Sequence, residues 1–210
     1  MSKVQGVKEK LHSPMYDAFF VPQGTPFQTE MQKRDPRVIR YFMDVQNKTK
    51  LETNLPAAGV LPSLNTFEAR ALRVVVSSLH RFGPTSTEPK KELKAERNEA
   101  EILADLIYNS VTTLIVGEKV MIEMPTFWFP AGAGVSPGLS TVPGHGEPNP
   151  TATFRFAEPV FIEPQQNFRV EILFPQGLPG QATDEHKLAG VKGPLRIWVV
   201  LDGYLTRDVQ

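Results

Sequence analysis

Residues 195–201 read Leu-Arg-Ile-Trp-Val-Val-Leu, an almost unbroken apolar run near the end of a 210-residue chain. A run of this kind indicates a central β-strand that is covered on both faces. The pair Asp202-Gly203 follows it directly and predicts a turn. Earlier in the chain, residues 168–174 carry an apolar side chain at every second position, from Phe168 to Phe174. This alternation predicts a second strand with one buried face.

Nineteen prolines separate such runs from one another, and few of them lie inside a run. Proline has no backbone N–H to donate to a sheet, so it collects in the loops between strands. The chain therefore reads as about eight strands connected by proline-containing loops. We predict an all-β protein, a β-sandwich of two sheets in a single domain.

Residues 66–79 form the longest strand candidate, and their pattern changes phase. Phe67, Ala69 and Ala71 share one face, whereas Leu72, Val74 and Val76 share the other. One extra residue in a β-bulge reverses the facing of everything that follows it. A strand buried on both faces would produce the same pattern.

One helix is predicted, over about residues 88–110. Thr87 can cap it and Pro89 suits its first turn. The apolar side chains recur at helical spacing along one stripe, at Leu93, Ala100, Ile102, Leu103, Leu106 and Ile107.

A hairpin should follow this helix, because Gly117-Glu118 lies between two apolar runs. In the second run Val120, Ile122 and Met124 are expected to point inward.

Residues 1–35 are polar and interrupted, with one aromatic island at residues 16–21. We expect this segment to be an extended N-terminal arm that lies on another surface, and residues 36–210 to form the sandwich domain. The arm either wraps its own domain or reaches a neighbouring subunit.

Composition excludes several functions. The 23 basic and 23 acidic residues cancel, so no basic excess favours specific nucleic-acid binding. The chain has no cysteine, and its four histidines form no His-x-His pair. No serine is accompanied by the patterned His and Asp partners of a nucleophilic triad. We expect no enzyme, no cofactor and no metal site. Residues 1–10 lack the apolar core of a signal peptide, and no apolar run approaches the roughly 18 residues of a membrane span, so a soluble, unprocessed chain is expected.

Acidic residues inside the predicted strands have a simple interpretation. Glu68, Glu123 and Glu171 are expected to form cross-strand ion pairs and not a catalytic pair of carboxylates.

The candidate contact region is the loop at residues 127–150. It begins with the aromatic residues Phe127, Trp128 and Phe129, and it contains five prolines and His145. Three successive aromatic residues must alternate faces, so they either fill one end of the domain or form a platform for a sugar or a base. His145 is expected to be an exposed loop residue.

Four strings carry a resemblance to a known family. They are Thr53-Asn54-Leu55-Pro56-Ala57-Ala58-Gly59-Val60-Leu61-Pro62, then Pro125 with Pro130-Ala131-Gly132-Ala133-Gly134, then Pro164-Gln165-Gln166-Asn167-Phe168, and the ending from Leu201 to Gln210. Together they resemble the single jelly-roll capsid proteins of tailless icosahedral bacteriophages, some of which have an internal membrane. The resemblance covers about residues 50–210 and implies an eight-stranded jelly roll without an enzymatic site.

From this resemblance we expect a virion structural protein that self-assembles into an icosahedral shell through its loops and its N-terminal arm. Its partners would be copies of itself and other capsid proteins, with a membrane or the packaged genome nearby. It would be made in the host cytoplasm and reside in the capsid. The alternative is a carbohydrate- or receptor-binding β-sandwich that uses the loop at 127–150. A cupin-type enzyme, the third hypothesis, is weakened by the missing His-x-His pair.

Overall fold

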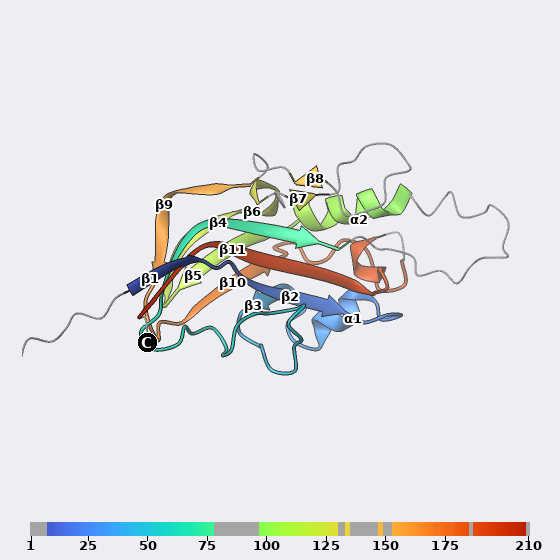
Figure 1. Ribbon diagram of the computed structural model, residues 1–210. Helices are drawn as coiled ribbons and strands as arrows, with labels where there is room; N and C mark the ends of the chain where they lie inside the picture. The colour runs from blue at the N-terminus through green and yellow to red at the C-terminus, as the bar shows by residue number, and fades with distance from the viewer. Residues whose placement is uncertain are drawn as a thin grey trace, which may run out of the picture.

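The computed structural model describes residues 8–77, 97–129, 133–134, 147–148, 153–184 and 187–208 (Figure 1). Its elements, in chain order, are β1 (Lys8–His12), β2 (Met15–Val21), α1 (Phe27–Gln32), β3 (Val38–Tyr41), β4 (Thr66–Val76), α2 (Arg97–Tyr108), β5 (Val111–Val116), β6 (Lys119–Pro125), η2 (Thr126–Trp128), β7 (Ala133–Gly134), β8 (Glu147–Pro148), β9 (Arg155–Ile162), β10 (Phe168–Leu173), η3 (Leu188–Gly190) and β11 (Leu195–Asp208). The prediction of an all-β protein is confirmed.

Two antiparallel sheets build the domain. In the first, β11 lies between β4 on one side and both β1 and β2 on the other, and β9 continues the sheet beyond β4. The second sheet has the order β3-β10-β5-β6. The short strands β7 and β8 pair only with each other.

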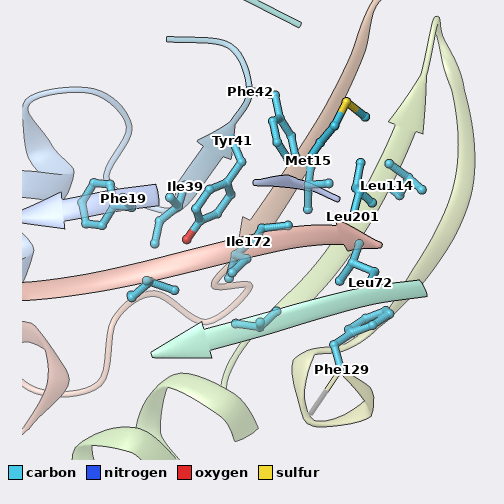
Figure 2. Packing of buried hydrophobic residues seen from close by; sticks show 14 of the residues in the cluster. Met15, Phe19, Ile39, Tyr41, Phe42, Leu72, Leu114, Phe129, Ile172 and Leu201 are labelled. Carbon is cyan, nitrogen blue, oxygen red and sulfur yellow. The ribbon is translucent and has the colours of Figure 1, made fainter. Parts of the chain in front are cut away.

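The apolar core lies between the two sheets. In β11 the buried residues are Leu195, Ile197, Val199 and Leu201, so every second side chain points inward. They belong to one cluster with Val170 and other side chains of the second sheet. Figure 2 shows side chains of both sheets, among them Leu201, Leu72, Ile172 and Leu114, meeting in this layer. The alternation predicted for residues 168–174 is confirmed, because Phe168, Val170, Ile172 and Phe174 are buried.

The phase change in β4 is a bulge. Ala69 pairs with Gly203 of β11 and Ala71 pairs with Asp202, so Arg70 is the extra residue. Arg70 is exposed, and the residues on both sides of it are buried. The bulge interpretation of the sequence pattern is therefore confirmed.

Asp202-Gly203 is not a turn. β11 continues through this pair for 14 residues, from Leu195 to Asp208. Gly203 lies opposite the bulge, where a Cβ atom would approach the Glu68 carbonyl oxygen to 2.1 Å. Glycine is therefore needed here because the neighbouring backbone comes close, and not because the chain reverses.

The predicted hairpin is present, with one error in its facing. Gly117 has φ 62° and begins the turn between β5 and β6. Ile122 and Met124 pack against the core, as expected. Val120, however, is 50% exposed. The register shifts between the pair of Val120 with Ile115 and the pair of Ile122 with Leu114, so Met121 is a bulged residue and the facing of Val120 is reversed.

The N-terminal segment differs most from the expectation. Within residues 8–35, β1 and β2 pair with β11 along one edge, and α1 follows them. Phe19 and Phe27 are buried and in edge-to-face contact at 5.6 Å, and Phe27 also contacts Phe174. Of the two alternatives for this segment, residues 8–35 follow the first, because they lie on their own domain. They are part of its sheet and its core, so the domain does not begin at residue 36.

The predicted helix is present as α2. Ile102 and Leu106 are buried, which confirms this part of the apolar stripe. The described part of the helix begins at Arg97, so the predicted start at residue 88 lies outside the described residues.

Two neighbouring phenylalanines test the place of β2 in the core. Phe19→Ala should lower the free energy of unfolding by about 3–5 kcal/mol, because it empties a fully packed site. Phe20→Ala, the matched control, should cost about 1 kcal/mol, mostly through the lost stacking of Arg196, 4.3 Å above its ring. Chemical denaturation measures both values. Equal costs would contradict a core role for β2.

Candidate functional site

The predicted contact residues separate into three groups. Phe127 and Trp128 are 48% and 47% exposed, whereas Phe129 is buried. Phe129 contacts Phe154 edge to face at 5.4 Å, inside the core cluster. His145 lies outside the described residues. Phe127 and Trp128 are therefore accessible for a contact, whereas Phe129 belongs to the core.

A short 3-10 turn, η2, produces this separation. Buried Thr126 begins the turn, and its hydroxyl lies 2.7 Å from that of Ser110 and 2.9 Å from that of Thr112. At the other end the Phe129 carbonyl accepts a hydrogen bond from the backbone N–H of Val74. The turn is thus held at both ends, and the two rings between these anchors extend outward.

The exposed rings form a row that continues onto neighbouring elements. Tyr108, at the end of α2, is 73% exposed, and its ring centroid lies 6.0 Å from that of Phe127. Phe127 and Trp128 are also 6.0 Å apart, with an interplanar angle of 30°. Trp128 then meets Phe154 edge to face at 6.3 Å. We call Tyr108, Phe127 and Trp128 the aromatic row.

A groove of about 480 Å³ lies beside this row, between β6 and β9. Its apolar lining includes Met121, Ile122, Met124, Phe154, Phe156 and Val160. Two carboxylates, Glu123 and Glu158, belong to the same lining. Each sheet ends here, since β6 is the last strand of one sheet and β9 the last strand of the other. The groove and the aromatic row together form the β6–β9 surface.

A polar cluster lies on the opposite edge of the domain. Asp17 is fully buried, and its carboxylate accepts hydrogen bonds from the Lys48 ammonium at 2.8 Å and the Phe42 backbone N–H at 2.6 Å. Burial raises the pKa of Asp17 above its usual 3.8, and Lys48 opposes this increase. Burial, with the nearby charge of Asp17, also raises the pKa of Tyr41 well above 10.

This cluster has a structural explanation. Phe42 has φ 68°, and its N–H bond to Asp17 holds the chain where it leaves β3. The carboxylate is already occupied by Lys48 and by backbone, so the cluster fixes the loop that follows β3.

A second charged group lies on the outer face of the first sheet. Glu68 of β4 accepts hydrogen bonds from Lys10 of β1 and Arg70 of the bulge. Both cations also lie about 5 Å from the Tyr204 ring, at 5.0 and 4.9 Å. The hydrogen bonds from Lys10 and Arg70 lower the pKa of Glu68 below its usual 4.5. Similarly, the backbone N–H of Arg37 and the side chain of Arg40 lower the pKa of Asp35.

The three strand glutamates can now be compared with their predicted ion pairs. Glu68 has its pair, and Glu171 pairs with Arg169 and Arg40. Glu123 has no ion pair with any described residue, so this part of the prediction is wrong. It is the glutamate that lines the groove.

Sequence reasoning missed Tyr108, Met121 and the groove itself. Tyr108 carried a weak signal, an aromatic residue at the end of the predicted helix. The exposure of Met121 depends on the bulge in β6, which its apolar sequence does not indicate.

Comparisons with known proteins leave the site to be argued from its own geometry, since no protein-family model and no curated protein matches the chain. In the described parts of the chain, no helix is long and apolar enough to cross a membrane. Nor do these residues include a group of three or more His, Asp or Glu side chains that could hold a metal ion.

Glu68→Gln should change how stability depends on pH. Because the native pKa of Glu68 is lowered, its contribution is present above the usual 4.5 and is lost as pH falls through the native value. Between about pH 5 and pH 3, the wild type should therefore lose more unfolding free energy than Glu68→Gln. Denaturation at several pH values measures this, with Glu163→Gln as a control for removing a carboxylate. Parallel profiles for wild type and Glu68→Gln would contradict the assignment.

Proposed function

We propose that this chain is a virion structural protein, a capsid protein of the single jelly-roll type that functions by self-assembly and performs no catalysis. The observation that carries the proposal is the nested pairing of its strands. β2 pairs with β11, β3 with β10, β4 with β9, and β5 with β6. The first long strand thus pairs with the last, the second with the second last, and so on inward.

Nested pairing of this kind supports a jelly roll, in which eight strands form two four-stranded sheets. The two sheets would be β2-β11-β4-β9 and β3-β10-β5-β6, with β1 as an addition beside β2. Jelly rolls occur in viral capsids, but also in lectin domains and cupins. The fold is therefore compatible with a capsid protein, and the choice among these three classes depends on the surface of the domain.

The β6–β9 surface favours a building block among these possibilities. Phe127 and Trp128 expose about half of each ring, so roughly 100 Å² per ring remains available for contact. Val120 and Met121 of β6 add to it, being 50% and 36% exposed. Contiguous apolar surface beside a groove is typical of protein–protein contacts.

The partners under this proposal are further copies of the chain and other capsid proteins, and the location is the capsid of a virion made in the host cytoplasm. A membrane or the packaged genome would lie near the assembled shell. The zero formal net charge is compatible with close packing of many copies.

Assembly is the direct test. The purified full chain should form discrete oligomers, rings or shells as its concentration rises, because apolar surface is removed from water at each contact. Light scattering gives the mass and electron microscopy the shape. A chain that stays monomeric at every concentration would contradict the proposal.

The aromatic row supports a second candidate, a carbohydrate- or receptor-binding module. Exposed rings tilted by only 30° and 35° to their neighbours resemble a stacking platform for sugar rings. In that case a monomeric protein should bind glycans on an array, and Trp128→Ala should abolish the binding. Unchanged binding by Trp128→Ala would exclude the platform.

A further inference from the structure

Charged side chains in four strands of this domain are all paired within the chain. Every charged residue of β2, β3, β4 and β10 forms an ion pair, namely Asp17, Arg40, Glu68, Arg70, Arg73, Arg169 and Glu171. Ion pairing is thus common even for strand positions close to solvent, although Lys8 of β1 and both Arg196 and Asp208 of β11 form no ion pair with another described residue.

The two edge strands β6 and β9 differ from these four strands, because none of their charged side chains is paired with a described residue. β6 carries Lys119 and Glu123, and β9 carries Arg155 and Glu158. All four side chains are exposed, and none has an ion pair or a side-chain hydrogen bond with a residue that the structure describes. Each edge strand therefore presents one unpaired cation and one unpaired anion beside the groove.

Backbone pairing with another strand is obstructed at both edges. β6 contains the bulged residue Met121 and ends at Pro125, which has no N–H to donate. In β9, residues 156–159 lie opposite the single residue Arg70, and Pro159 is one of them. Bulges and prolines are typical protections of edge strands against pairing. A partner at this surface must therefore be held by side chains.

We propose that the β6–β9 surface binds the same surface of a second copy of this chain, related by a two-fold axis. The inference rests on the proposed function, because it names the contact through which copies associate. A two-fold interface places one patch against itself, so the patch must be complementary to itself. Two carboxylates in the groove lining and one cation on each of its two strands give this surface both signs of charge, so that each sign can face the opposite sign in the partner.

The apolar centre would supply most of the free energy of association. Trp128, Phe127 and Met121 belong to residue types that are enriched at interfaces. Against them, the partner would bring the same rings and the same groove. The four charges would then form the rim, where each cation meets a carboxylate of the other copy.

Charge reversal in two complementary variants tests this contact. The double variant Glu123→Lys/Glu158→Lys places four cations on the surface, and Lys119→Glu/Arg155→Glu places four anions there. Each variant alone should weaken self-association by at least about tenfold, because like charges then face each other. An equimolar mixture should restore association to near the wild-type level. Sedimentation of the full chains at several concentrations measures all three.

Controls separate this contact from folding and from general charge effects. Each variant should keep the wild-type unfolding temperature, because the four side chains are exposed and form no ion pair with a described residue. Arg37→Glu/Lys50→Glu reverses two exposed charges elsewhere and should associate as the wild type does. Raising the salt concentration should reduce the difference between the variants and the wild type.

The outcomes distinguish the two proposals. If the wild type associates and either double variant associates equally well, the β6–β9 contact is wrong while self-assembly stands. If each variant associates more weakly but the equimolar mixture does not regain association, the two-fold contact is likewise wrong while self-assembly stands. If the wild type is monomeric throughout, self-assembly and this contact both fail.

Discussion

The architecture depends on β11, which holds the first sheet together. Its 14 residues pair with β4 along one side and with both β1 and β2 along the other. Four of its side chains are buried in the shared core, and each fully buried aliphatic side chain contributes about 1.5–3 kcal/mol relative to exposure. Because β2 and β4 are each followed in the chain by a strand of the second sheet, and β11 itself follows β10 of that sheet, the register of β11 also constrains where the second sheet lies (Figure 1).

Strands whose facing follows from their own residues were predictable from the sequence. The alternation at residues 168–174 and the phase change around Arg70 have local causes, so pattern alone revealed both. The N-terminal segment is different, because β1 and β2 are strands only through their pairing with β11, about 190 residues away in the chain. No local pattern contains that information, so the sequence alone indicates only an aromatic island at residues 16–21 in an arm. The turn predicted at Asp202-Gly203 is wrong for a related reason. Gly203 is needed because the bulge in β4 brings the backbone of another strand close to it.

The candidate site was half predictable. Three successive aromatic residues must divide between faces, and they do, but which of them is exposed depends on the hydrogen bonds that anchor η2 to Ser110, Thr112 and Val74. The groove could not be predicted from the sequence at all. It exists because two edge strands from different sheets come together, and because a bulge in each strand moves side chains away from regular positions.

The contrast between paired and unpaired charges is informative because exposed ion pairs contribute little stability. An exposed pair is worth about 0–1 kcal/mol, so the fold itself loses almost nothing when Lys119, Glu123, Arg155 and Glu158 lack partners. Charges at the rim of an apolar contact act mainly on orientation and on the choice of partner, since a wrong alignment brings like charges together. The bulges and prolines of β6 and β9 exclude the less specific alternative, in which edges join by backbone hydrogen bonds in several registers. An edge that is closed to backbone pairing, apolar at its centre and charged with both signs at its rim can therefore accept a second copy in one orientation without promoting open-ended sheet growth.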